Sequence, residues 1–276
     1  MKRIAIAITA LLFCLPACAQ DWAKQTLEKS PRHQEWVDIK HDGRTVHAFI
    51  VYPEVKTKAT AVLVIHEIFG LTDWARSVAD DLAAHGYIAI APDLLSGTGK
   101  DSQGTPGFAT QQDAMKAVSG LDPNMVTADL NAAADYVKKL PASNGKLVVG
   151  GFCWGGSQTF RFATNRKDLR AAFVFYGTPP SDSATAPVTP KDVASITAPV
   201  YGFYGGNDAR VDATIPAATE AMKAAGKKYD PVTYEGAGHG FMRAGMDPTQ
   251  DPAKNEANKK AHDEAWQRWL TLLKSI

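Results

Sequence analysis

The chain has 276 residues, of which 45% are hydrophobic and 21% charged, and its formal net charge is +1. This length and apolar content suffice for one large domain with a substantial core. The small net charge, without a basic run interleaved with aromatic residues, argues against nucleic-acid binding and favours a small partner of little or no charge.

Residues 1–19 have the features of a secretory signal peptide. Lys2 and Arg3 form a positive start, residues 4–15 are apolar, and the small residues 17–19 (ACA) fit a cleavage site. The apolar stretch is too short for a convincing membrane span. We therefore expect a mature chain without a transmembrane span, exported to the periplasm or secreted.

Export bears on the three cysteines, Cys14, Cys18 and Cys153. Removal of the signal peptide leaves Cys153 as the remaining cysteine. In a second interpretation, residues 15–18 (LPAC) resemble a lipobox, which would place a lipid anchor at Cys18. Neither interpretation allows an intramolecular disulfide. A lone thiol in an oxidising compartment is a liability unless it is buried or used, which favours a functional role for Cys153.

The single expected domain, residues 20–276, begins with a polar arm and a hairpin. Residues 20–32 are polar and predict at most an ordered arm. Apolar and polar residues alternate over 36–39 and 45–52, on either side of a turn at 41–44 (HDGR). This pattern predicts two antiparallel strands.

The rest of the chain alternates short apolar runs with amphipathic stretches, which is typical of an α/β protein. The apolar runs predict strands at residues 61–65, 87–91, 146–150, 171–176, 199–204 and 229–234. The amphipathic stretches predict helices at residues 74–86, 125–140, 213–225 and 252–273. Because wholly apolar strands fit a sheet that is covered on both faces, we expect a mostly parallel central sheet between two helical layers.

Two longer segments lack a regular pattern. Residues 92–121 are rich in Gly, Ser, Thr, Pro and Gln and predict an excursion over the upper edge of the sheet, with at most one short helix. Long loops of this kind often shape a binding site. Residues 177–198 form a second loose segment, and neither an internal repeat nor a second domain boundary is evident.

Residues 151–155 (GFCWG) join the predicted strand at residues 146–150 to a stretch, from Ser157 onward, that can continue as a helix. They match the nucleophile elbow, with cysteine in the position of the usual serine. Such a turn strains the backbone of the nucleophile, so Gly151 and Gly155 must lack side chains to let strand and helix approach. The helix N-terminus favours a thiolate at Cys153. A buried free cysteine in a glycine-rich turn is the alternative interpretation.

A base and an acid follow two later strands. Asp208 comes directly after the strand 199–204, and His239 follows the strand 229–234 within GAGHGF. Nucleophile, acid and base thus occur in the order of α/β-hydrolases, and at the carboxyl edge of a parallel sheet they would converge. Alone, Asp208 is compatible with a helix cap and His239 with a flexible surface residue, but together they favour a catalytic triad.

With residues 66–71 (HEIFGL) and 91–94 (APDL), these motifs resemble the dienelactone hydrolase family, from residue 35 to the C-terminus. The resemblance implies an α/β-hydrolase fold and hydrolysis of a small ester or lactone without a cofactor. It implies that Cys153, Asp208 and His239 form a triad that works through a thioester acyl-enzyme.

The resemblance also assigns roles around this triad. Backbone N–H groups of Ile68 and Trp154 would form the oxyanion hole. Glu67 would contact the resting thiol and swing away when substrate binds, and a carboxylate beside a thiol raises the thiol pKa, which would suppress oxidation. A strand-end carboxylate bonded to backbone is the alternative for Glu67.

The resemblance also bears on the residues that contact the substrate. Arg243 matches an arginine that contacts a substrate carboxylate, but the second arginine of the family is missing after residues 91–94, and Lys100 lacks its bidentate fork. This departure weakens the case for dienelactone itself. Phe69, Trp154 and Tyr176 are predicted as apolar walls of the acyl pocket, although aromatic residues are equally typical of a core.

Other functional classes compete with the hydrolase. An exported binding or envelope-interaction protein could keep the fold without useful turnover. A thiol redox protein is disfavoured because the mature chain has no C-x-x-C and no resolving cysteine. His66-Glu67 and His239-Gly240 do not form a recognisable metal-ligand set, so we expect no metal.

Overall fold

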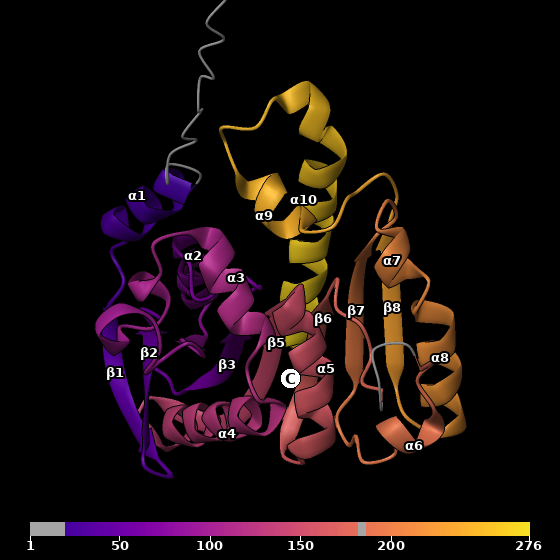
Figure 1. The fold of residues 1–276 in the computed structure, drawn as a ribbon, viewed down its shortest axis with the longest axis horizontal. Coiled ribbons are helices and arrows are strands. Elements are labelled where there is room, and N and C mark those ends of the chain that lie inside the picture. Colours follow the sequence, from indigo (N-terminus) through magenta and orange to yellow (C-terminus); the bar gives the residue numbers. More distant parts are fainter. Residues whose placement is uncertain (1–19, 182–185) are drawn as a thin grey trace, which may run out of the picture.

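The computed structural model describes residues 20–181 and 186–276 (Figure 1). The predicted signal peptide, with Cys18 and its predicted lipid anchor, lies outside the described residues. The strands are β1 Gln34–His41, β2 Arg44–Val51, β3 Ala59–Ile65, β4 Ile88–Pro92, β5 Ser143–Phe152, β6 Leu169–Phe175, β7 Val200–Gly205 and β8 Tyr229–Tyr234. The helices are α1 Asp21–Lys29, α2 Asp73–Ala84, α3 Gln111–Ser119, α4 Pro123–Lys139, α5 Trp154–Asn165, α6 Pro190–Val193, α7 Ala209–Asp212, α8 Ile215–Ala224, α9 Phe241–Met246 and α10 Pro252–Lys274, with 3-10 turns η2 Lys100–Ser102 and η3 Thr105–Gly107.

The strands of the described residues form one sheet in the order β1-β2-β4-β3-β5-β6-β7-β8. β2 pairs antiparallel with both β1 and β4, which accommodates the predicted hairpin at one edge. The other pairs of adjacent strands, β4 with β3, β3 with β5, β5 with β6, β6 with β7 and β7 with β8, are all parallel. This architecture confirms the predicted α/β-hydrolase fold.

Helices cover both faces of the sheet (Figure 1). On one face α4, α5 and α8 bury Leu130, Phe160 and Met222 against the strands. On the other face α2 and α10 bury Trp74 and Trp269. The central strands contact apolar layers on both sides, which explains why their sequences are continuously apolar. No helix of residues 20–181 and 186–276 combines the length and the apolar character that a membrane crossing requires.

The N-terminal segment differs from the prediction of an arm. It forms α1, which packs its buried side chains against α2. Just beyond α1, the fully buried carboxylate of Asp80 accepts hydrogen bonds from Ser30 (2.6 Å), from Gln34 (3.1 Å) and from the guanidinium of Arg32. Because this anchor lies some fifty positions away along the chain, local sequence patterns do not reveal it.

The remaining differences concern short elements. The excursion between β4 and α4 contains the expected short helix, α3, preceded by η2 and η3. Neither α7 nor α9 has a counterpart among the predicted helices. Both are too short for apolar periodicity to be recognised. α9 begins two residues after His239 and carries Arg243, so it contributes directly to the predicted site.

Candidate active site

Cys153 lies at the sharp turn between β5 and α5. Its φ of +56° is in the left-handed region that residues with a side chain rarely adopt. A Cβ added to Gly151 would lie 2.3 Å from the carbonyl oxygen of Gly155, and one added to Gly155 would lie 2.3 Å from that of His66. Strand and helix therefore approach each other as closely as the elbow pattern requires.

His239 joins Cys153 to Asp208. Its Nε2 lies 3.0 Å from the Cys153 Sγ, and its Nδ1 is hydrogen-bonded to Asp208 Oδ2. A carboxylate can only accept, so Nδ1–H donates and Nε2 faces the sulfur. The other oxygen of Asp208 accepts from the Val211 N–H at 3.4 Å, at the start of α7. Asp208 therefore both contacts His239 and caps α7, which was the alternative role considered for it.

The charge state of His239 follows from these partners. Burial alone would lower the pKa of His239, but hydrogen bonds and charge interactions with Cys153 and Asp208 outweigh burial and raise it to about 9. At neutral pH the ring is therefore an imidazolium, with a proton on the nitrogen that faces the sulfur.

Tyr176 packs against the ring of His239. Its side chain is only 1% exposed, its φ is +40°, and its ring packs edge-on against the His239 imidazole with 5.1 Å between centroids. The Tyr176 hydroxyl donates to Glu67 Oε1 at 3.4 Å. In this conformation the Tyr176 ring is buried beneath His239 and Glu67, and its role as an apolar wall of the acyl pocket stays a prediction.

Glu67 is paired with an arginine. Arg243 Nε donates to Glu67 Oε2 at 2.9 Å, and the Glu67 side chain is 4% exposed. Its side-chain hydrogen bonds within the described residues go to Arg243 and Tyr176, so the predicted contact with the Cys153 thiol is absent in this conformation. Burial raises the pKa of Glu67, and the charge of Arg243 opposes that rise.

Arg243 keeps part of its guanidinium available. The bond to Glu67 uses Nε, and the side chain is 33% exposed. Its guanidinium carbon lies 5.3 Å from the centroid of the Phe69 ring, within the range of a cation–π contact. The terminal amino groups can therefore meet an anionic group beside Phe69. Lys100, considered above as a substitute for the missing arginine, is exposed on η2.

The predicted oxyanion donors lie on two segments in direct contact. Trp154 is the first residue of α5, so its N–H has no partner within the helix. The Ile68 N–H likewise makes no hydrogen bond within the described residues. The segments that carry them meet where the backbone of Gly155 packs on the carbonyl of His66.

The structural position of His66 was not predicted from the sequence, in which this residue opens the motif of residues 66–71 and belongs to a pair rejected as metal ligands. The ring has no exposed surface, and its Nδ1 lies 2.7 Å from the carbonyl oxygen of Glu67. The Leu94 N–H points to its Nε2 at 3.3 Å. In the described part of the chain, no three acidic, histidine or cysteine side chains form a group that could hold a metal ion.

Asp93 was also missed, and it anchors the excursion after β4. Its buried carboxylate accepts from the N–H (2.7 Å) and the hydroxyl (2.8 Å) of Thr105. The Thr105 hydroxyl in turn accepts from the Leu71 N–H at 2.9 Å. The excursion is thereby fixed to the loop that follows β3. The only sequence signal for Asp93 and His66 is a polar residue directly after a wholly apolar strand.

A groove of about 710 Å³ lies between the anchored excursion, α2 and β1. Its aromatic lining comes from Trp36, Phe69 and Phe108, and the ion pair between Arg76 and Asp73 lies in its wall. Because Phe69 directly follows a predicted oxyanion donor, the groove begins beside the site.

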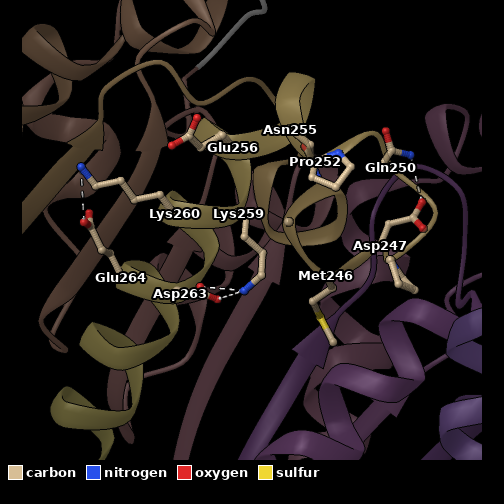
Figure 2. A pocket seen from close by; sticks show the side chains of 12 residues that line it. Met246, Asp247, Gln250, Pro252, Asn255, Glu256, Lys259, Lys260, Asp263 and Glu264 are labelled. Atoms are coloured by element: carbon tan, nitrogen blue, oxygen red, sulfur yellow. Dashed lines mark hydrogen bonds and ion pairs between the residues drawn. The ribbon is translucent and has the colours of Figure 1, made fainter.

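A second cavity, of about 650 Å³, is lined by α9, the loop after it and α10 (Figure 2). The polar pairs drawn in Figure 2 are Lys259 with Asp263 at 2.7 Å, Gln250 with Asp247 at 3.0 Å and Lys260 with Glu264 at 4.0 Å. None of the predicted site residues lines this cavity. It is therefore not part of the candidate active site.

Comparison with known proteins agrees with the fold and the site motifs. The sequence model described as the dienelactone hydrolase family matches residues 46–276. A Salmonella typhimurium protein, provisionally assigned as a carboxymethylenebutenolidase, is 33% identical over 240 residues, which cover 84% of this chain and 83% of the relative. A Bradyrhizobium protein, provisionally assigned as a 2-oxo-3-(5-oxofuran-2-ylidene)propanoate lactonase, is 32% identical over 75% of this chain and 83% of its own.

Among solved structures, a Klebsiella pneumoniae protein provisionally assigned as a dienelactone hydrolase has a TM-score of 0.75 and 27% identity. The similarity covers 89% of this chain and 99% of that one. Sequence match, relatives and architecture therefore agree with the resemblance carried by the motifs. The chain belongs to the dienelactone hydrolase family.

Proposed function

We propose that this hydrolase cleaves a small carboxylic ester or lactone with Cys153 as its nucleophile, through a thioester acyl-enzyme. The observation that carries the proposal is the hydrogen-bonded series of Cys153, His239 and Asp208 at the carboxyl edge of the sheet. A nucleophile, a base and a group that orients the base are the parts that acyl transfer requires. The names of the two relatives, a carboxymethylenebutenolidase and a lactonase, fit this substrate class.

In the acylation half-reaction, His239 Nε2 already carries the proton of the pair, and the Cys153 sulfur, as a thiolate, forms a bond to the substrate carbonyl carbon. The carbonyl electron pair moves onto oxygen, where the N–H groups of Ile68 and Trp154 stabilise the negative charge. As the carbonyl re-forms, the carbon–oxygen bond to the leaving group breaks. His239 returns its proton to the departing alkoxide, which in a lactone stays attached to the acyl chain.

In the deacylation half-reaction, His239 takes a proton from water while the water oxygen attacks the thioester carbon. Collapse of this second intermediate breaks the carbon–sulfur bond and releases a carboxylic acid, which restores the sulfur as a thiolate beside protonated His239. One water is consumed for each ester bond. Asp208 holds Nδ1–H throughout, so that Nε2 faces first the sulfur and then the water.

We further propose that Arg243 recognises an anionic substrate group. Its terminal amino groups are free of the bond to Glu67, and its guanidinium lies over Phe69 at the entrance to the groove. A panel of esters and lactones, with and without a carboxylate, tests this contact. We expect Arg243→Ala to abolish any preference for the carboxylate members, and an unchanged preference would contradict the assignment.

The test of the function is pre-steady-state hydrolysis of p-nitrophenyl acetate by the mature protein. We expect a burst of p-nitrophenol equal to the Cys153 content, followed by turnover. Cys153→Ala and His239→Ala should each reduce kcat by at least about 10³-fold. His262→Ala serves as the matched control, because His262 is a partly buried histidine on α10 outside the site.

The outcome separates the hydrolase from the competing class. A binding or envelope-interaction protein with the same fold would show neither burst nor turnover. Full activity in a folded Cys153→Ala variant would refute the thioester mechanism while leaving ester hydrolysis itself intact. Circular dichroism and thermal unfolding of each variant check that the lost activity is not lost folding.

A further inference from the structure

We infer that His66 is a positioning residue that orients the peptide group between Glu67 and Ile68 and thereby aims the Ile68 N–H at the substrate oxygen. The inference rests on the proposed function, in which that N–H stabilises the tetrahedral intermediate. His66 directly follows β3, which ends at Ile65, and it precedes the loop residues that supply this donor. Its contribution would be made through the backbone of its neighbours.

The two partners of the His66 ring determine its tautomer. The Leu94 N–H donates to Nε2 at 3.3 Å, so Nε2 must carry a lone pair. The ring proton therefore resides on Nδ1, which donates to the Glu67 carbonyl oxygen at 2.7 Å. A neutral ring agrees with complete burial, which lowers the pKa of His66.

The hydrogen bond to Glu67 fixes the direction of the next N–H. The Glu67 carbonyl and the Ile68 N–H belong to one planar trans peptide group, so they point in opposite directions. The carbonyl is held by two donors, the His66 ring at 2.7 Å and the Gly70 N–H at 3.2 Å. Donation to a peptide carbonyl also polarises the group and strengthens its N–H as a donor.

The same ring supports the segment that carries the second donor. The His66 imidazole stacks on the Trp154 indole, with 5.6 Å between centroids and 16° between planes. The backbone carbonyl of His66 packs against Gly155, where even a Cβ would approach to 2.3 Å. One residue therefore contacts both backbone segments whose N–H groups would converge on the oxyanion.

A histidine that only satisfies hydrogen bonds in the core is the competing explanation. In that case the contact with Leu94, which anchors the start of the excursion after β4, would be the important one. Loss of the ring would then reduce stability and leave kcat unchanged. The two ring nitrogens contact different partners, so variants that restore one contact at a time can separate these roles.

Three substitutions make this separation. His66→Asn places an amide donor near the position of Nδ1 and can restore the bond to the Glu67 carbonyl. His66→Gln places its amide near the position of Nε2 and can restore the bond to the Leu94 N–H. His66→Leu restores neither. His262→Leu is the matched control, because His262 also stacks on a tryptophan, Trp266, with 6.4 Å between centroids.

Two rates are measured for each variant. The first is kcat, with KM, for p-nitrophenyl acetate, whose hydrolysis passes through an oxyanion. The second is alkylation of Cys153 by iodoacetamide, which displaces iodide from a saturated carbon and forms no oxyanion. We expect His66→Leu and His66→Gln to lower kcat about 10- to 100-fold, since complete loss of one donor costs about 10²–10³. KM and the alkylation rate should stay within about threefold of wild type, because neither depends on the donor.

The decisive result is recovery of most of the lost kcat in His66→Asn. Wild-type kcat in folded His66→Leu, an equal loss in alkylation, or recovery by His66→Gln instead of His66→Asn would overturn the inference. If His66→Leu does not fold, the comparison of His66→Asn with His66→Gln decides alone. A wild-type protein that is alkylated but does not hydrolyse esters overturns the proposed function, and the role of His66 with it.

Discussion

His239 exchanges hydrogen bonds with both Cys153 and Asp208, and these contacts raise its pKa to about 9. In the unfolded chain the pKa of a histidine is about 6.5. Because the folded pKa is the higher one, the stability that protonated His239 contributes is complete below about pH 6.5 and is lost as the pH rises through about 9. We therefore expect wild type to exceed His239→Gln in stability by more at about pH 6 than at about pH 10.

Urea unfolding of both proteins at these two pH values measures the difference. His262→Gln is a control of opposite sign, because burial lowers the pKa of His262 and its contribution is lost as the pH falls. If the stability lost in His239→Gln and in His262→Gln changed with pH in the same direction, the ion pair between His239 and Asp208 would be contradicted.

Single residues show where prediction from sequence succeeds and where it ends. Cys153, Asp208 and His239 follow the carboxyl ends of β5, β7 and β8, and chain order alone indicates that they converge. The burial of Tyr176 and the partner of Glu67 depend on how loops from distant strands pack. Their orientation leaves no local pattern in the sequence. The motifs therefore identify these residues but do not predict which groups their side chains contact.

At the scale of elements, two neighbouring aspartates of α2, beside α1, have opposite effects on the stability of the fold. The fully buried Asp80 is bonded to Ser30, Gln34 and Arg32, whereas burial, with the nearby charge of Asp80, raises the pKa of Asp81 to about 6. Removing one partner of a buried ion pair costs about 3 kcal/mol. We expect Asp80→Asn to destabilise the protein by about this amount.

Asp81→Asn is the matched control. The folded state disfavours the charged form of Asp81, so its ionisation reduces stability at pH 7, above its folded pKa. We expect the amide to be neutral or slightly stabilising, as measured by urea unfolding at that pH. Equal destabilisation by the two substitutions would show that the aspartate–arginine contact does not anchor α1.

β1 contributes a wall of the groove beside the site, although it precedes the family match at residue 46. Trp36 on this strand is 49% exposed, and Val55, the other large apolar residue with comparable exposure, is 47% exposed and does not line the groove. If the groove takes a bulky aryl or acyl group, loss of one aromatic contact of about 1 kcal/mol raises KM about fivefold.

We therefore expect Trp36→Ala to raise KM about fivefold for a bulky aryl ester and to leave p-nitrophenyl acetate unaffected. Val55→Ala should change neither. Steady-state kinetics with the two substrates provides the measurement. An equal change in KM for both esters would show that the groove does not select the substrate.

For the whole molecule, apolar runs were sufficient to identify the strands, but not their order. β4 lies between β2 and β3, and β3 lies next to β5, so that several neighbours in the sheet are not consecutive in the chain. Hydrophobic periodicity reports burial and not the identity of the partner strand. The strand order was therefore not predicted from the sequence, and α7 and α9 were missed because neither is long enough to show a period.

The first residues that the structure describes lie directly after the predicted cleavage point. The side-chain oxygen of Gln20 accepts from the Trp74 N–H at 3.2 Å, and α1 starts at Asp21. Since the chain already contacts the core there, we propose that export removes residues 1–19 and leaves this domain in the periplasm. In a Gram-negative host, we expect an osmotic-shock fraction whose mass corresponds to residues 20–276, unchanged by Cys18→Ser. Membrane association that Cys18→Ser abolishes would establish the lipid anchor instead, and a full-length cytosolic chain would refute export.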